Sequence, residues 1–297
     1  GPETGFVQQL QTDGFTRRHD AYPSGFGPYS QTRMARQTGG IFFMLPSLEA
    51  KLVRGEKRRY ELEAMRTYRP DLRSRLELVA DRDQSHMRKV LTKVVYDLNP
   101  YNEIAAKIID MRVSFSPNPQ QFAKEVVEAH LKVKFYLPYL DAAIHEIEKI
   151  RPMRDQDLSP RWRANYDLMN AQLMAYRVRL FEYGIALGQF GKNMPRLIPP
   201  KNPPHNYWEI RHGSDKLLMP DAQQEKALGV TAEQLRSYHR EALQQLASVR
   251  EAHEGTPWAM KAEWEESRRF GATFRSWRYD PPKSTKPQPK RIPLPKL

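Results

Sequence analysis

The sequence contains no cysteine. Disulfide bonds, thiolate metal sites and cysteine nucleophiles are therefore excluded for this chain, while the compartment stays open because many exported proteins also lack cysteine. No stretch approaches the run of about 18 apolar residues that a membrane-spanning helix needs. The sequence therefore predicts no transmembrane helix.

The short motifs that mark common catalytic sites are also missing. The sequence has no Gly-x-Ser-x-Gly elbow, no P-loop and no Gly-x-Gly-x-x-Gly fingerprint. His145-Glu146-Ile147-Glu148 lacks the second histidine of a zinc-binding helix, and His205 and His212 have no carboxylate partner at a defined spacing. We therefore predict surface positions for these histidines, no metal or cofactor site within this chain, and no enzymatic activity.

What the sequence does contain is enough apolar material for a core and an excess of positive charge. Of its 297 residues, 39% are hydrophobic, and the formal net charge is +13. Such a charge favours contact with anionic surfaces. The candidate contacts with a partner or a polyanion are Arg58, Arg59, Arg177, Arg179, Lys286, Lys290 and Arg291.

Two long segments carry apolar residues in alternating steps of four and three, which is the spacing of one helix face. They cover residues 119–150 and 159–190, and the connector 151–158 is short enough to make them antiparallel. Ser159 and Pro160 mark the start of the second helix, and Pro138 predicts a kink in the first. We therefore predict a mainly α-helical bundle over residues 47–198, with the long antiparallel hairpin 119–190 as its spine.

The remaining segments read as attachments to this spine. Residues 199–220 are rich in proline and predict an extended strap pinned by its aromatics, with a peptide-like docking motif as the alternative. Residues 221–272 predict a helical hairpin of tetratricopeptide type, in which Thr231 caps the first helix and Thr256-Pro257 starts the second. Residues 273–297 form a basic, proline-rich tail that we expect to lack packed structure.

The first 46 residues have a different character. Residues 1–27 show no periodicity and predict a connection outside the core, whereas Tyr29–Gln37 predicts a short helix that Thr38-Gly39-Gly40 ends. Ile41–Leu45 is then a continuous apolar run before Pro46. Such a run suggests a strand of a parallel sheet covered by helices.

These residues carry a family resemblance. Gly25–Tyr29, Thr32–Ala35 and Thr38–Phe43 resemble the last helix and last strand of a von Willebrand factor A (vWA) domain. The whole chain resembles the C-terminal part of large bacterial proteins in which a vWA domain precedes a helical region. The resemblance implies that residues 1–46 are the end of such an α/β domain. Its divalent metal, such as Mg²⁺, would bind an Asp-x-Ser-x-Ser loop that this sequence lacks, so we expect the metal-binding half upstream of Gly1.

These features of the sequence are compatible with two functional hypotheses of different classes. The first is non-catalytic scaffolding, in which helical faces of a vWA-containing bacterial protein bind a protein partner. The alternative is a binder of nucleic acid or another polyanion that acts through its basic surface and tail. Because the aromatic residues fall mostly on the apolar helix faces and no nucleic-acid motif is present, the first is favoured.

Overall fold

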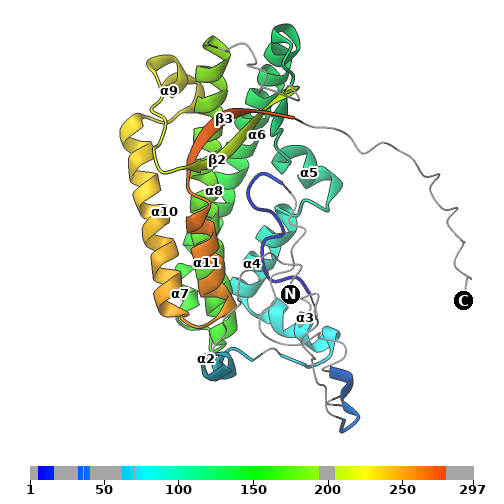
Figure 1. Ribbon diagram of the computed structural model, residues 1–297. Helices are drawn as coiled ribbons and strands as arrows, with labels where there is room; N and C mark the ends of the chain where they lie inside the picture. Colours follow the sequence, from blue (N-terminus) through cyan, green and yellow to red (C-terminus); the bar gives the residue numbers. More distant parts are fainter. Residues whose placement is uncertain are drawn as a thin grey trace, which may run out of the picture.

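The computed structural model of the chain describes residues 6–16, 33–35, 37–40, 62–69, 71–193 and 205–278. The described part is mainly helical, as predicted, with a small antiparallel sheet near one end of the longest helices (Figure 1). Residues 41–46, the expected vWA-like strand, lie outside the described residues.

The first described helices are short. They are α2 (Leu62–Thr67), α3 (Arg75–Gln84), α4 (His86–Asp97) and α5 (Glu103–Ile109). Ser85 is the N-cap of α4, because its side chain accepts a hydrogen bond from the Arg88 amide. Ser74 and Glu77 form a reciprocal capping box at the start of α3.

The predicted hairpin is present. It consists of α6 (Pro119–Lys149), the single turn α7 (Arg151–Arg154) and α8 (Pro160–Lys192). The Tyr166 hydroxyl donates to the Ile147 carbonyl at one end, and the His130 ring contacts the Gly184 carbonyl towards the other. These pairings run in opposite directions along the chain, so the two helices are antiparallel. Helix α6 continues as one element through Pro138.

Helix α8 occupies the centre of the molecule, so its predicted single apolar face is an incomplete description. Residues on its other sides are buried too. The predicted face consists of Trp162, Tyr166, Met169, Leu173, Tyr176, Leu180, Tyr183, Leu187 and Phe190, all buried except Phe190. Eight of the residues that widen the buried surface are small or polar: Ala164, Asn165, Ala171, Gln172, Ala175, Arg179, Glu182 and Ala186. Larger apolar residues, among them Leu168, Phe181 and Ile185, are buried there as well. Small side chains let neighbouring helices approach closely, and α6, α10, α11 and β3 all pack on α8.

The C-terminal helices include the two that were predicted for residues 221–272. They are α9 (Ala222–Leu228), which was not predicted, α10 (Ala232–Ala252) and α11 (Pro257–Ser267). Thr231 and Thr256 are the N-caps of α10 and α11, as expected. Trp258 and Ala262 of α11 are wholly buried. Both helices contribute to the same hydrophobic core as α6 and α8, so this hairpin is part of the central body.

The sheet corrects two predictions. It joins β1 (Ser114–Phe115), β2 (Tyr207–Ser214) and β3 (Gly271–Trp277) in that order, and both pairings are antiparallel. Residues 207–214 of the strap are therefore a paired strand, and residues 273–277 of the expected tail are also a strand. Phe190 of α8 stacks on Phe274 and contacts Trp208, which pins the sheet to the helices. Local sequence missed these strands because the pairing partners are distant in the chain.

Candidate functional site

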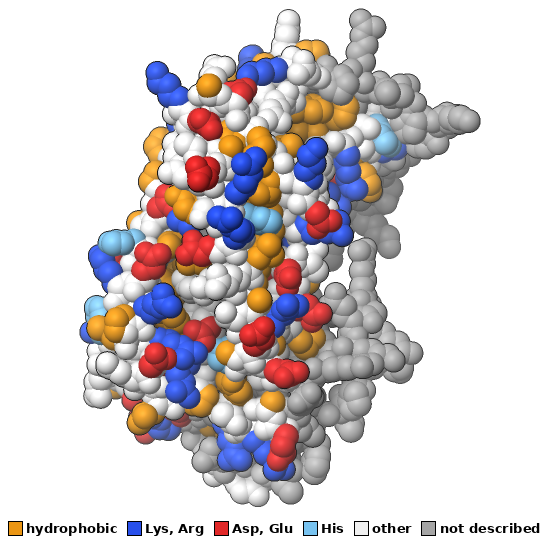
Figure 2. Space-filling view, turned by 90° about the vertical axis from the view of Figure 1, so that its left-hand side faces the viewer, with side chains coloured by type: hydrophobic (Ala, Val, Ile, Leu, Met, Phe, Trp, Pro, Cys, Tyr) orange, Lys and Arg blue, Asp and Glu red, His pale blue; other side chains and the backbone are white. Residues whose placement is uncertain are grey.

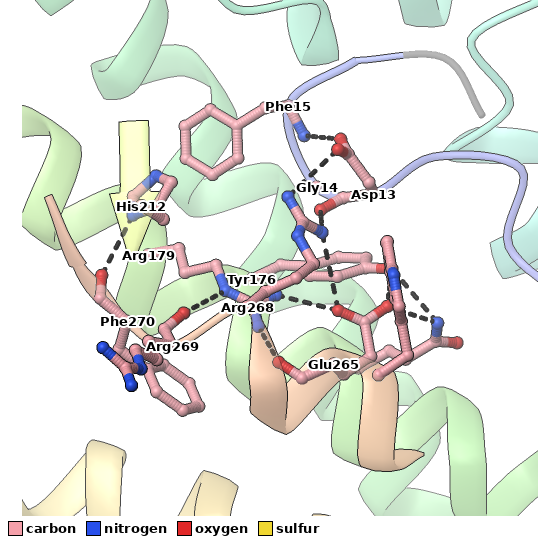
Figure 3. Close-up of polar contacts among 12 residues, drawn as sticks. Asp13, Gly14, Phe15, Tyr176, Arg179, His212, Glu265, Arg268, Arg269 and Phe270 are labelled. Atoms are coloured by element: carbon pink, nitrogen blue, oxygen red, sulfur yellow. Dashed lines mark hydrogen bonds and ion pairs between the residues drawn. The ribbon is translucent and has the colours of Figure 1, made fainter. Parts of the chain in front are cut away.

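A cluster of buried charged side chains lies where the N-terminal loop, α8 and the end of α11 meet (Figure 3). Glu265 is central and inaccessible to solvent. Its Oε2 lies 2.9 Å from Nη1 of Arg179 and 3.5 Å from Nη1 of Arg268. Its Oε1 accepts a hydrogen bond from Gln172 Nε2 at 2.9 Å and lies 3.5 Å from Nζ of Lys261. Both carboxylate oxygens therefore face several donors.

The electrostatics of the cluster favour a structural role. Burial raises the pKa of Glu265, but the charges of Lys261, Arg179 and Arg268 outweigh it and lower the pKa to about 2. A carboxylate with so low a pKa is a weak general base at neutral pH. Arg179 also donates to the carbonyls of Arg269 and Glu265. The cluster therefore acts as an internal ion network that joins α8 to the end of α11.

The N-terminal loop is part of this network, so the prediction that residues 1–27 lie outside the core is wrong for residues 6–16. Leu10 and Thr12 are wholly buried. Arg268 donates to the Asp13 carbonyl at 2.8 Å, and its Nη2 lies 3.0 Å from Asp13 Oδ2. The prediction failed because polar residues can enter a core when distant partners satisfy them.

Gly14 shows how closely this loop approaches α8. Its φ is +94°, a backbone conformation that residues with a side chain rarely adopt. A Cβ at this position would lie 2.8 Å from the ring of Tyr176. Asp13 Oδ1 accepts hydrogen bonds from the amides of Phe15 and Thr16, which closes the turn around Gly14. The turn therefore places Asp13 within reach of Arg268.

His212 lies beside the network and is half-buried, so its predicted surface position holds only in part. Its Nδ1 donates to the Phe270 carbonyl at 2.9 Å, and its ring packs 4.6 Å from that of Phe15. Burial lowers the pKa of His212 to about 3, so the ring is neutral. A pocket of about 420 Å³ adjoins it, but the Nε2 atom of His212 is covered from solvent. The neutral ring, which packs on Phe15 and donates to the Phe270 carbonyl, is thus a packing group.

The other two histidines differ from each other. His145 is exposed on α6, as predicted. His205 is half-buried, and its Nδ1 lies 2.7 Å from Oγ of Ser276, which joins the chain before β2 to β3. The hydrogen-bond partner of His205 is therefore a hydroxyl group in a paired strand.

A second network of polar side chains lies near the start of α8 and joins α7, α8 and the end of α10. The hydroxyl of Tyr68 lies 2.9 Å from Nδ1 of His253, and Nε2 of His253 lies 2.8 Å from Oδ2 of Asp167. Arg154 also binds Asp167 through Nε at 2.9 Å. Burial raises the pKa of Tyr68, so its hydroxyl stays protonated and is a poor nucleophile. This order of groups resembles a catalytic relay, but it fastens the loop after α2 to α8 and α10.

The two candidate contact residues on α8 are committed to internal partners. Arg179 is wholly buried in the ion network, so its predicted contact with an external partner is wrong. Arg177 lies between α6 and α10, 3.6 Å from Asp141 and 4.0 Å from Glu241, with its guanidinium over the ring of Tyr238. The other five candidates, Arg58, Arg59, Lys286, Lys290 and Arg291, lie outside the described residues.

The charge on the described surface is mixed. Figure 2 shows acidic and basic side chains interspersed on the side of the molecule that α9 and α10 form. The described residues carry nearly as many acidic as basic side chains, so most of the net charge of +13 belongs to the rest of the chain. The described part therefore offers little support for polyanion binding.

The feature that most resembles a binding surface is on α6. Val127, Leu131 and Phe135, here called the outer row, are 60%, 51% and 71% exposed. Residues four apart lie on the same side of a helix, so the three form one apolar row. The opposite side of α6, which includes Val133 and Leu140, is buried against the core. The spacing of the outer row was present in the sequence, but the stronger pattern of the buried side concealed it.

The chain has no match among known protein families, curated proteins or solved structures. Within the described ranges, no three metal-binding side chains come together, and no helix is long and apolar enough to cross a membrane.

Proposed function

We propose that this chain is a non-catalytic scaffold that binds a protein partner through the outer row of α6. The observation that carries the proposal is the exposure of three large apolar side chains, Val127, Leu131 and Phe135, in one row. A contiguous apolar surface of this kind marks interaction sites in soluble proteins. Residues at i, i+4 and i+8 are also the anchors by which one helix packs on another.

The rest of the molecule supports a scaffolding role. Helix α6 is 31 residues long, or about 45 Å at 1.5 Å per residue, and its inner side is fixed against α8. The charged groups at the centre bind one another, as the contacts of Glu265 show. The outer row is therefore presented on a rigid support.

The proposal keeps the resemblance of residues 1–46 to the end of a vWA domain. The local structure at the motif supports it, because residues 33–35 are helical and Gly39 has a φ of +70°. The Gly40 amide donates to the Ala35 carbonyl at 2.8 Å, which is how a glycine ends a helix. We therefore place the scaffold directly after such a domain in a bacterial protein.

The experiment is site-specific photo-crosslinking. A photoreactive phenylalanine analogue replaces Leu131, and the protein is irradiated in an extract of the organism from which the gene comes. The matched control carries the analogue at Ser248, an exposed position on α10. We expect one protein, identified by mass spectrometry, to be crosslinked at position 131 and absent from the control.

A second variant tests whether the crosslink depends on the row itself. Adding Phe135→Glu to the position-131 protein should remove the crosslink, because a charge then occupies the centre of the apolar contact. Equal crosslinking at both positions, or crosslinking that survives Phe135→Glu, would reject the proposal.

A further inference from the structure

We propose that the partner of the outer row is an acidic amphipathic helix, an inference that rests on the proposed function above. Three observations lead to it: the shape of the apolar surface, the pairing of the acidic side chains around it, and the lysines that are left beside it.

The apolar surface has the length of a helix. Beyond Phe135 it continues along α6 through Pro138 and Ala142, which are both exposed. Ala142 also lines a pocket of about 140 Å³ between α4 and α6, together with Val90 and Val94. From Val127 to Ala142 the surface extends about 22 Å, which is four turns of a partner helix.

The acidic side chains around the surface already have basic partners. Glu128 lies 3.5 Å from Arg112, and Asp141 lies 3.6 Å from Arg177. Glu146 lies 2.7 Å from Lys149. Arg112 also lies 3.3 Å from Glu125, and Arg177 also lies 4.0 Å from Glu241, so these two arginines are shared and compensate the acidic charge in part.

The lysines beside the outer row are not compensated in this way. Lys124 and Lys134 are exposed, and neither has an acidic partner among the described residues. Lys132 donates to the carbonyl of Asp110, a neutral group. Three lysine ammonium groups without an acidic partner in the described part of the chain thus lie beside the outer row, where they complement carboxylates on a partner.

The same charges disfavour a second copy of this chain as the occupant. A symmetric contact between two outer rows would bring the lysines of both copies to one interface. Like charges at an interface oppose association. A polyanion alone is also disfavoured, because phosphates gain nothing from the apolar side chains that occupy the middle of the surface.

The test uses two designed 18-residue helical peptides with the same leucine face. One has glutamates on both sides of that face, and the other has lysines at the same positions. Binding to the whole chain is measured by fluorescence anisotropy at low and moderate salt. We expect the acidic peptide to bind at least ten-fold more tightly than the basic one, and the preference to shrink as salt rises.

Two variants of the chain locate the binding. Leu131→Glu with Phe135→Glu should weaken binding of the acidic peptide at least ten-fold. Lys124→Glu with Lys134→Glu should reverse the preference between the two peptides. The matched control, Gln244→Glu with Ser248→Glu on the exposed side of α10, should change neither affinity. Circular dichroism confirms that each variant is folded.

The outcomes separate this inference from the proposed function. Equal binding of both peptides, or binding of neither, overturns the acidic partner, while the crosslink at position 131 still decides whether the row binds a protein. Concentration-dependent dimerisation that Leu131→Glu abolishes would replace the acidic helix with a second copy. Loss of the site-specific crosslink overturns the proposed function itself.

Discussion

Helices α6 and α8 have nearly the same length and begin in the same way, yet their surroundings are opposite. Each starts with a capping side chain, Asn118 or Ser159, followed by a proline. Helix α8 is buried on all sides for most of its length, including the charged residues Arg179 and Glu182. Helix α6 is buried on one side and exposes Val127, Leu131 and Phe135 on the other.

The difference shows that residue type alone does not place a side chain. In α8 the charged groups are inside because distant segments supply partners, as Glu265 does for Arg179. In α6 large apolar groups are outside because no described element packs on that side. Buried charges therefore mark places where the fold is fixed, and exposed apolar rows mark places where a partner can be added.

The strongest test of the α8 side of the comparison is Glu265→Ala. Removing the carboxylate leaves Arg179 and Lys261 buried without their main counter-charge, so we expect a loss of about 3–5 kcal/mol of unfolding free energy. Urea denaturation measures it, with Glu263→Ala on the exposed side of α11 as the control. A loss no greater than that of the control would show that the network contributes little.

The pH dependence of stability tests a second buried carboxylate of α8. Glu182 accepts hydrogen bonds from the amides of Leu218 and Ala272, and burial raises its pKa to about 7 from an ordinary value of 4.5. The folded state therefore favours the protonated form. This contribution is fully present below pH 4.5 and is lost as pH rises through about 7, by on the order of 3 kcal/mol.

Glu182→Gln should remove that loss. We expect the variant to gain stability relative to the unchanged protein between pH 5 and pH 8, which urea denaturation across this range measures. Glu265 does not interfere, because its contribution to stability is fully present above pH 4.5 and is lost only as the pH falls towards about 2. Parallel profiles for the two proteins would mean that Glu182 ionises in the folded state as it does in the unfolded chain.

The approach of the N-terminal loop to α8 predicts a smaller effect. Gly14→Ala introduces a Cβ at a positive φ and against the ring of Tyr176, so we expect a loss of about 1–3 kcal/mol and faster proteolysis within residues 6–16. Gly191→Ala is the control, because a Cβ there meets no atom within 4 Å. In helix α8 this control should be neutral or stabilising by up to about 1 kcal/mol. Equal effects of the two changes would contradict the tight contact.

The smallest effect on stability is expected on the outer row. Leu131→Glu replaces a half-exposed apolar side chain on α6 and should change the unfolding free energy by less than about 0.5 kcal/mol. Thermal unfolding followed by circular dichroism checks this. A large loss would mean that Leu131 is part of the core, and the contrast between the two helices would disappear.

Much of the helical layout was predictable from local patterns. Ser85, Ser159, Thr231 and Thr256 cap their helices as the sequence indicates, because capping depends only on the next few residues. The antiparallel hairpin followed from two long apolar periodicities and a short connector. The strands 207–214 and 271–277 were missed, since each is stabilised by a partner more than fifty residues away.

The candidate site was less predictable than the fold. Asp13, Arg179 and Glu265 are far apart in the sequence, and no spacing rule links them. His212 was placed on the surface because its partners, Phe15 and the Phe270 carbonyl, come from other segments. The outer row of α6 was visible as a spacing of four, yet its exposure depended on which side of the helix the core would occupy.

The sequence by itself determined where α8, α10 and α11 begin, how long the two central helices are, and that these two pair as a hairpin, because these features depend on contacts a few residues apart. Only the tertiary structure decided that α8 lies at the centre and α6 at the edge. That choice depends on where α10, α11, the sheet and residues 6–16 pack. The same packing buried Arg179 with Glu265 and left Phe135 exposed, because distant segments supplied partners to one helix and none to the outer side of the other.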